Sequence, residues 1–478
     1  MIGDGSGASG LAGSLRERGA LLLARGAGAA TRWLRRGGGT ALPGLVATAL
    51  APALLEELGR LPGHGSVTVT GTNGKTTTAH LLSAAARAAG LQPLANHSGS
   101  NLERGIVSAF VAAMTAGGRL PVAFRRLGVF EVDEAALPGV LPRLRPRAAL
   151  FLNLFRDQLD RYGEVDSLAE GWWGALEGDA SGLTLVLNAD DPSIARLAGA
   201  AGGEVVTFGV EDCDVALAGV EHAADARFCD CGALYAYDAV FIGHLGHWRC
   251  DACGRRRETP AVSARAVELL ADGVRFELAL PGETLAVALP LAGLHSVYNA
   301  LAAAAGAHAL GLPVTAIAHA LEGAGPAFGR QERFRVYDRD VRLLLAKNPA
   351  GMNELLRTLV TPAPPGPVLH LLAVLNDGVA DGRDVSWIYD ADLELLQGRA
   401  ATIVVSGTRA DELALRLVLA GLEPALVEPH LASALERAIE LTPPGARLDV
   451  LATYTAMVEL REALANRTGV APYWGAAS

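Results

Sequence analysis

Residues 67–77 read VTVTGTNGKTT, and this stretch decides the fold. A β-branched run precedes a turn with two glycines, and Lys75-Thr76 opens a helical stretch. This order is that of a phosphate-binding loop, because backbone N–H groups of the turn and of the helix N-terminus can face phosphate oxygens, Lys75 can reach the terminal phosphates and Thr76 can ligate Mg²⁺. Val69 stands where the usual pattern has its first glycine, so this loop is a shorter form. The residues expected to bind the nucleotide are Gly71, Thr72, Asn73, Gly74, Lys75, Thr76 and Thr77.

Lysine is nearly absent from the chain. Of its 41 basic residues only Lys75 and Lys347 are lysines, and all the others are arginines. A compact ammonium differs from a planar guanidinium where a phosphoryl group must be gripped and released, so both lysines are candidate catalytic residues. The 51 acidic residues give a formal net charge of -10, which disfavours binding to nucleic acid.

Strand-like and helix-like segments alternate along the 478 residues, a length that suits two or three domains. The alternation predicts an α/β fold with largely parallel sheets. We expect an N-terminal segment 1–45, an ATP-binding domain 46–329 and a C-terminal α/β domain 330–478, with a linker at 328–332. The expected strands lie within 66–70, 122–132, 148–154, 183–187, 263–289, 341–345, 368–374, 401–406 and 449–453.

Four of the five cysteines fall within 25 residues. Two paired-Cys turns can supply four thiolates to a tetrahedral Zn²⁺, so the clustering predicts a zinc ribbon inserted at 221–258 rather than disulfides. The first pair is C-x-C, one residue shorter than the C-x-x-C of the second, and other nearby residues remain alternative ligands. The predicted ligands are Cys229, Cys231, Cys250 and Cys253, and the alternatives are Cys213, His244 and His247.

No stretch of 18 uncharged apolar residues and no secretory signal is recognisable, so we expect a cytoplasmic chain with no transmembrane helix. Residues 11–36 alternate Leu and Ala with Arg at helical spacing. This pattern fits either a surface helix or a basic helix that lies on a membrane.

The loop T-G-T-N-G-K-T-T resembles that of the Mur ligase and folylpolyglutamate synthase superfamily, which joins an acid to an amine through an acyl phosphate. Residues 130–134 (FEVDE) end a strand and resemble the superfamily's acidic metal site, in which Glu131 holds Mg²⁺. Residues 153–161 (NLFRDQLDR) are similar to an N-x-x-x-D-H-L-D segment, with Gln158 in place of the usual His ligand. The resemblance implies a nucleotide contact at Asn299, although a helix-capping role remains an equal alternative.

Three C-terminal segments indicate one family within this superfamily. They are 346–354 (AKNPAGMNE), 375–390 (LNDGVADGRDVSWIYD) and 453–457 (TYTAM). Together with the four-Cys module they closely resemble the MurT family, the ligase subunits of lipid II isoglutaminyl synthases. The resemblance implies a Mur-ligase-like ATP-binding domain with an inserted zinc ribbon, followed by a Rossmann-like C-terminal domain that binds a partner. It also implies ATP-dependent amidation of the α-carboxylate of D-Glu in the lipid II stem peptide to D-isoglutamine. The reaction would occur at the inner face of the cell membrane, with ammonia from a GatD glutaminase in a heterodimer.

Residues of the C-terminal part are also candidates for this reaction. Lys347 opens the second domain, so we expect it to meet the γ-phosphate or the acyl phosphate when the domains close. Arg330 and Glu332 lie at the linker, where we expect them to act in the hinge or in nucleotide contact. For the partner, the resemblance implies a carboxylate supplied by this chain. Asp384 or Asp390 completes a Cys-His-Asp triad in the glutaminase partner, and the sequence does not choose between them. Two other functions remain open: another acid–amine ligase of the superfamily, such as a folylpolyglutamate synthase, or a catalytically dead nucleotide-binding scaffold.

Overall fold

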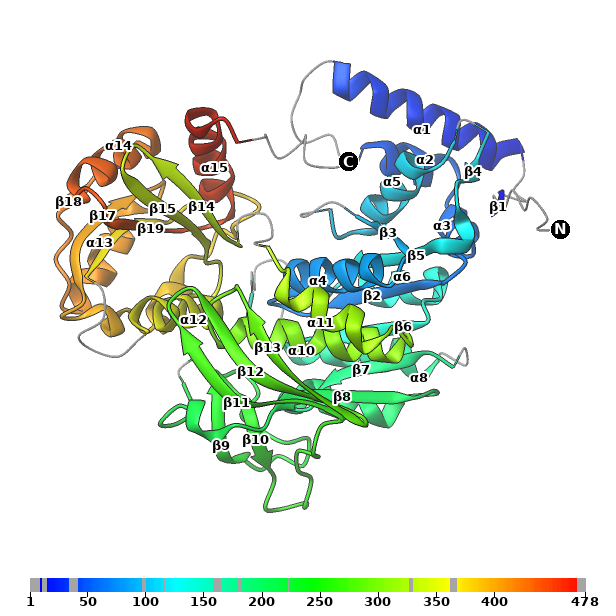
Figure 1. The fold of residues 1–478 in the computed structure, drawn as a ribbon, viewed down its shortest axis with the longest axis horizontal. Coiled ribbons are helices and arrows are strands. Elements are labelled where there is room, and N and C mark those ends of the chain that lie inside the picture. Colours follow the sequence, from blue (N-terminus) through cyan, green and yellow to red (C-terminus); the bar gives the residue numbers. More distant parts are fainter. Residues whose placement is uncertain are drawn as a thin grey trace.

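Two α/β units make up the molecule (Figure 1). A computed structural model describes residues 9–10, 15–33, 42–96, 100–115, 117–157, 165–178, 182–221, 223–325, 330–361 and 368–470. We call residues 42–325 the N-terminal unit and residues 330–470 the C-terminal unit. The first contains a nine-stranded sheet and the second a six-stranded sheet.

The strands of the nine-stranded sheet follow the order β13-β12-β11-β8-β7-β6-β2-β5-β3. The seven strands from β11 to β3 pair in parallel, and β12 and β13 add an antiparallel edge. The central strands are buried along their whole length, as expected when helices cover both faces of a parallel sheet. The strands are β2 (Ser66–Thr70), β3 (Gln92–Ala95), β5 (Arg126–Glu131), β6 (Ala148–Phe151), β7 (Thr184–Asn188), β8 (Val205–Val210), β11 (Val262–Leu270), β12 (Gly273–Leu280) and β13 (Glu283–Leu289).

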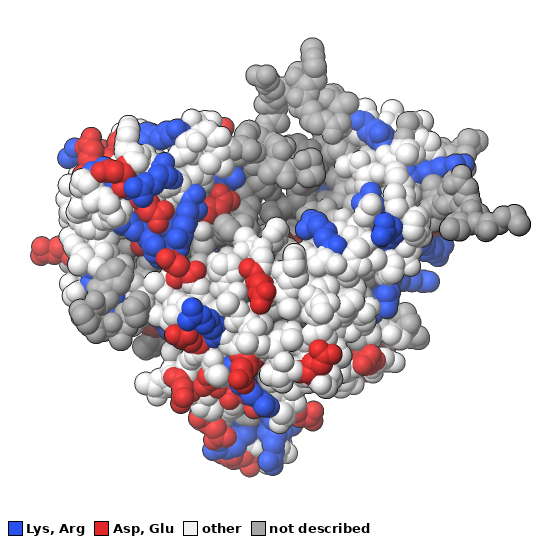
Figure 2. Space-filling model, viewed as in Figure 1, with Lys and Arg blue, Asp and Glu red and all other residues white. Residues whose placement is uncertain are grey.

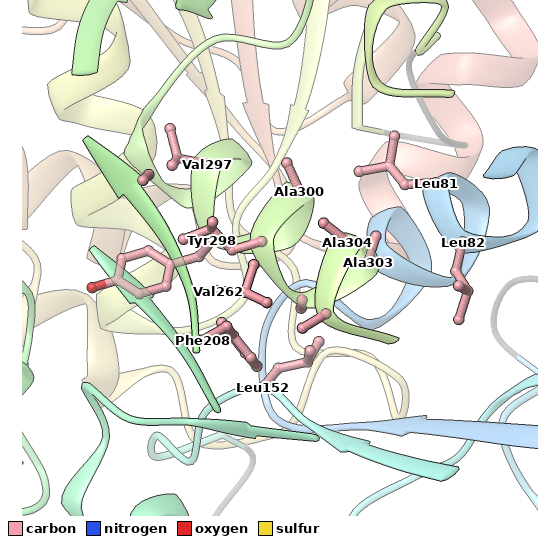
Figure 3. Packing of buried hydrophobic residues seen from close by; sticks show 14 of the residues in the cluster. Leu81, Leu82, Leu152, Phe208, Val262, Val297, Tyr298, Ala300, Ala303 and Ala304 are labelled. Atoms are coloured by element: carbon pink, nitrogen blue, oxygen red, sulfur yellow. The ribbon is translucent and has the colours of Figure 1, made fainter. Parts of the chain in front are cut away.

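Helix α10 (Leu294–Ala309) lies at the centre of the larger hydrophobic core of this unit. Its alanines allow close packing, and Figure 3 shows Ala300, Ala303 and Ala304 in the same buried cluster as Leu81 of α4 and Phe208 of β8. Besides α2, which is described below, the other α-helices of this unit are α3 (Leu54–Gly59), α4 (Lys75–Ala88), α5 (Glu103–Ala113), α6 (Leu137–Leu144), α8 (Val165–Glu177), α9 (Pro192–Ala195) and α11 (Val314–Glu322).

Three smaller pieces complete the N-terminal part of the molecule. Helix α1 (Leu15–Trp33) packs on α2 (Leu42–Leu50), which packs on α5. A short pairing of β1 (Ser9–Gly10) with β4 (Arg119–Leu120) lies beside α1. The antiparallel hairpin of β9 (Ala236–Ile242) and β10 (Leu245–Arg249) lies within the cysteine-containing segment.

The six-stranded sheet of the C-terminal unit follows the order β14-β15-β19-β16-β17-β18. Only its edge strand β14 is antiparallel to its neighbour. The strands are β14 (Arg330–Val336), β15 (Arg339–Leu345), β16 (Leu369–Val374), β17 (Ala400–Ser406), β18 (Leu426–Val427) and β19 (Arg447–Ala452). The helices are α12 (Pro349–Val360), α13 (Ala410–Leu419), α14 (Leu431–Leu441) and α15 (Tyr454–Thr468).

The α/β class and the parallel sheets expected from the sequence are confirmed, but the linker expected at 328–332 is wrong in part. Strand β14 begins at residue 330. Its charged sequence hid the strand, because only Phe334 and Val336 point into the core. An edge strand needs few apolar residues, since one of its sides has no neighbouring strand.

A buried carboxylate joins the sheet to α10 and to the cysteine-containing segment. The carboxylate of Asp190 accepts hydrogen bonds from the Tyr298 hydroxyl at 2.7 Å, the Val210 backbone N–H at 2.8 Å and the Arg257 Nε at 2.5 Å. Burial, followed by the Asp190 charge, raises the pKa of Tyr298 well above its ordinary value, so its hydroxyl remains a donor.

We expect Tyr298→Phe to lower the free energy of unfolding by about 1–3 kcal/mol, because a buried carboxylate oxygen loses a donor. Urea unfolding followed by circular dichroism measures the loss. Tyr337→Phe is the matched control, because that side chain is 80% exposed. Equal unfolding midpoints for the two variants would contradict the role of this hydrogen bond.

Candidate functional site

Two glycines shape the loop between β2 and α4. Gly71 has φ +131° and Gly74 has φ +93°, both in the region that favours glycine. A Cβ at Gly71 would lie 2.9 Å from the Asn153 carbonyl oxygen, and one at Gly74 would lie 2.1 Å from Asn299 Oδ1. The loop therefore requires glycine at both positions, for backbone conformation and for space.

The segment that follows β6 fixes the loop. The Asn73 backbone N–H donates to Asn153 Oδ1 at 2.9 Å, and Asn153 Nδ2 donates to the Asn73 carbonyl at 3.0 Å. The Thr72 hydroxyl accepts from the Phe155 N–H at 2.9 Å and donates to the Phe155 carbonyl at 3.0 Å. The loop is thus held in place by the protein itself.

Lys75 is buried at the start of α4. Its ammonium donates to the Gly71 carbonyl at 2.6 Å and lies 3.0 Å from Glu134 Oε2. Burial lowers the pKa of Lys75, but the carboxylates of Glu134, Glu131 and Asp157 outweigh burial and raise it, so the ammonium stays charged. Burial also raises the pKa of Glu134, against the opposing charge of Lys75.

Thr76 and Glu131 meet beside this lysine. The Thr76 hydroxyl donates to Glu131 Oε2 at 2.9 Å, and the backbone of Glu131 exchanges two hydrogen bonds with the Asn96 side chain. A hydroxyl and a carboxylate next to a phosphate-binding loop form the oxygen ligand set that Mg²⁺ prefers. The chemistry of these donors therefore fits a magnesium ion.

The C-terminal unit reaches the loop through the segment between β15 and α12. Lys347 forms an ion pair with Asp157 of the N-terminal unit. Asn348 caps α12 and exchanges hydrogen bonds with Asn73 of the loop, at 3.0 and 3.3 Å. The two lysines of the chain, Lys75 and Lys347, thus lie at the same site.

A cavity lies between the loop, α10 and α12. Asn299 lines it from within α10, with its Oδ1 next to Gly74. The helix begins at Leu294 after Gly293, so the helix-capping alternative for Asn299 is wrong. The cavity is also lined by Asn73, Thr77, Asn153, His295, Tyr298, Lys347 and Glu354.

The four paired cysteines converge at one point. Their sulfur atoms all lie within 4.8 Å of one another. The three alternative ligands lie elsewhere: Cys213 is near His247, and His244 lies 3.4 Å from Asp191. The shortened C-x-C pair therefore still contributes to a four-thiol cluster, which suits a tetrahedral metal ion such as Zn²⁺.

The two candidate aspartates of the partner triad differ in their surroundings. Asp390 lies 3.2 Å from Arg156 of the N-terminal unit. Asp384 is exposed, and its carboxylate accepts from the Ser386 backbone N–H at 2.9 Å. Hydrogen bonds from the Ser386 side chain and backbone lower the pKa of Asp384, so it is a carboxylate at neutral pH.

Two predicted residues cannot be placed, because Gln158 and the side chain of Arg330 lie outside the described part of the chain. The sequence alone gave no role to Glu134, Asn153 or Asp157, all of which contact the loop or a catalytic candidate. Glu134 lies in the motif 130–134, and Asn153 and Asp157 lie in the motif 153–161. All three follow a parallel strand, and side chains at the carboxyl ends of parallel strands commonly form binding sites.

Comparisons with known proteins identify the family of the chain. The model of the Mur ligase middle domain matches residues 69–231, and that of the MurT ligase C-terminal domain matches residues 345–457. The lipid II isoglutaminyl synthase (glutamine-hydrolyzing) subunit MurT of Staphylococcus aureus (strain COL) is 35% identical over 87% of this chain and 90% of its own length. The chain belongs to the MurT family. The corresponding subunit of Streptococcus pneumoniae (strain ATCC BAA-255 / R6) is 32% identical over 91% of this chain and 94% of its own.

Solved structures share the fold of this MurT-family ligase. A pseudomurein peptide ligase type C from Methanothermus fervidus aligns with a TM-score of 0.63 at 23% identity, over 86% of this chain and 79% of that one. MurF from Acinetobacter baumannii aligns with a TM-score of 0.62 at 20% identity, over 87% and 80%. Family membership makes the chain an ATP-dependent ligase.

We expect the purified MurT-family chain to contain about one Zn²⁺, as four thiols in a closed set predict. Cys231→Ser should lose most of this zinc and melt several degrees lower, because metal binding contributes to folding. Cys213→Ser, which changes the one cysteine outside the cluster, is the matched control. Elemental analysis and thermal melts test both points, and a wild-type zinc content near zero would refute the site.

Proposed function

We propose that this ligase converts the α-carboxylate of D-Glu in the lipid II stem peptide to D-isoglutamine, using ATP and ammonia. The observation that carries the proposal is the convergence of Lys75, Thr76 and Glu131 on a preformed phosphate-binding loop. The identity to MurT subunits supports the choice of substrate, since their names state lipid II isoglutaminyl synthesis.

A carboxylate needs activation before ammonia can replace one of its oxygens. In the proposed first step a carboxylate oxygen attacks the γ-phosphorus of ATP, and the bond to ADP breaks. Ammonia then attacks the acyl carbon, phosphate leaves with the transferred oxygen, and the amide nitrogen loses a proton. Lys75 and the N–H groups of the loop stabilise negative charge on the phosphoryl oxygens.

Thr76 and Glu131 would hold Mg²⁺, which when bound neutralises charge on the phosphates. Phosphate oxygens are acceptors of the same kind as the Glu134 carboxylate that Lys75 now contacts. We propose that the Lys75 ammonium exchanges this carboxylate for the terminal phosphate when ATP binds. Glu134 holds the ammonium charged and oriented until then.

Lys347 is proposed to meet the transferred phosphoryl group from the opposite side. Its ion pair with Asp157 and the Asn348–Asn73 hydrogen bonds hold the C-terminal unit against the loop. The closed arrangement would keep water away from the acyl phosphate, which water would hydrolyse. We propose that residue 330 divides the ATP-binding domain 46–329 from the C-terminal domain 330–478.

We expect Lys75→Ala to lower the rate of amidation at least about a hundredfold with either ammonia or glutamine as the nitrogen source, because it removes charge stabilisation at the transferred phosphoryl group. Arg87→Ala is the control, since that basic residue lies on the same helix but is exposed. Amide formation from ATP and a lipid II acceptor is measured by mass spectrometry. Near-normal turnover by Lys75→Ala would refute the proposed function.

The ammonia is proposed to come from a GatD-like glutaminase in a heterodimer. Four of the five cysteines form the metal cluster. The fifth, Cys213, is near His247, whose other ring nitrogen is bonded to the Val210 carbonyl, so among the described residues no carboxylate orients that histidine. A cysteine glutaminase needs such a triad, so we assign glutamine hydrolysis to a second polypeptide.

The C-terminal unit is the proposed docking site of this partner. Helix α13 exposes Leu415, Val418 and Leu419 at helical spacing. Asp384 is exposed and hydrogen-bonded within its own loop, whereas Asp390 forms an ion pair with Arg156 of the N-terminal unit. We therefore propose Asp384 as the carboxylate that orients the partner's catalytic histidine.

Asp384→Asn should lower glutamine-dependent amidation at least about a hundredfold while ammonia-dependent amidation stays within about threefold, because only the partner's triad loses its carboxylate. Asp338→Asn, which changes an exposed aspartate in the turn between β14 and β15, is the matched control. Both activities are measured in the reconstituted complex. An equal loss with both nitrogen sources, or a selective loss from Asp390→Asn instead, would contradict the assignment to Asp384.

A further inference from the structure

Charge is divided unevenly along the chain. Residues 1–147 contain 16 Lys and Arg against eight Asp and Glu, a net charge of +8, whereas residues 148–478 contain 25 against 43, a net charge of -18. Three of those eight acids, Glu131, Asp133 and Glu134, are buried near the phosphate-binding loop. The surface of the first part is therefore more basic than its net charge indicates.

This basic part exposes leucines on its outermost helices. On α1, Leu22 and Leu23 are 56% and 61% exposed, and on α2, Leu42 and Leu45 are 37% and 49% exposed. Figure 1 shows α1 at the outer edge of the molecule. No helix in the described part of the chain is long and apolar enough to cross a membrane.

The opposite face of α1 is firmly packed. Ala20, Leu21 and Ala24 are buried, and the Arg25 guanidinium donates to the Met114 carbonyl. Helix α2 is fixed to α5 by the Gly44 N–H, which donates to the Ser108 hydroxyl. The buried faces of α1 and α2 thus hold the exposed leucines in fixed positions.

Basic side chains lie beside these two helices. Arg104 is exposed in the first turn of α5, whose backbone touches α2 at Gly44, and Arg119 is exposed on β4, next to the residue that faces Leu21 of α1. Figure 2 shows Lys and Arg without neighbouring Asp or Glu over this part of the molecule, at the upper right. Acidic and basic side chains mix over the C-terminal unit and the lower part.

We propose that the outer faces of α1 and α2, with Leu22, Leu23, Leu42 and Leu45, form a docking surface for an anionic lipid bilayer. Exposed leucines on a basic surface insert at the bilayer interface, while arginines interact with anionic headgroups. The charge of this part is complementary to such a bilayer, and the net charge of -18 on the rest turns the remainder of the chain away from it.

The docking surface adjoins the site. Helix α5, which carries α2, begins at Glu103, and the Asp133 N–H donates to the Asn101 carbonyl just before it, next to Glu131. Helix α5 thus joins the docking surface to the phosphate-binding end of the sheet. This inference rests on the proposed function only for its link to a lipid-linked substrate, since vesicle binding needs no substrate.

Flotation of the full chain with vesicles tests the surface. We expect at least about tenfold more binding to phosphatidylcholine vesicles with about 30% phosphatidylglycerol than to phosphatidylcholine alone, and a loss of this binding as salt is raised. Leu22→Glu/Leu23→Glu should reduce binding to the anionic vesicles at least about tenfold. Leu415→Glu/Leu419→Glu, the same change on α13, should leave it unchanged. Arg104→Glu/Arg119→Glu should also reduce binding to the anionic vesicles, by a change that leaves the leucines in place.

Equal binding of the wild type to both vesicles, or unchanged binding by both the leucine and the arginine variants, would overturn the proposal. So would a wild-type dimer without vesicle binding that dissociates on the leucine change, because the face would then be a contact between copies. Leu22→Glu/Leu23→Glu should still amidate an acceptor that lacks the lipid. Absence of wild-type activity on lipid II dispersed in detergent, where no bilayer is needed, would refute the proposed function and leave the vesicle result standing.

Discussion

The buried ammonium of Lys75 is the charge around which the site is organised. A buried cation is costly unless opposite charges and acceptors surround it. The Gly71 carbonyl and Glu134 meet this requirement, and they lie on the turn after β2 and after β5, two neighbouring parallel strands. The requirement therefore fixes the geometry of the loop, the register of the two strands and the start of α4 together.

The charges around Lys75 also connect the two units. Lys347 contributes to the electrostatic surroundings of Glu134, and its own partner Asp157 contributes to those of Lys75. The junction between units is thus part of one network of charges. A change of partner at either lysine, such as the arrival of phosphate, alters the interactions of both units.

The sequence predicted the strand, loop and helix around Lys75, because glycines and the Lys-Thr pair act locally. It also predicted the four-thiol cluster, since paired cysteines carry their own signal. It could not predict the Lys75–Glu134 and Lys347–Asp157 pairs, because they depend on which strands become neighbours. Strand β14 was missed for a related reason: its burial depends on β15, with which it pairs.

Oxygen transfer reports directly whether this loop activates a carboxylate by phosphorylation. The acceptor would carry ¹⁸O in the α-carboxylate of D-Glu, and the mass of the phosphate released with ATP and ammonia would be measured. If an acyl phosphate forms, each phosphate gains one ¹⁸O atom from the carboxylate, and the other ¹⁸O atom is retained in the amide. Amide formation with unlabelled phosphate would contradict an acyl phosphate at this site.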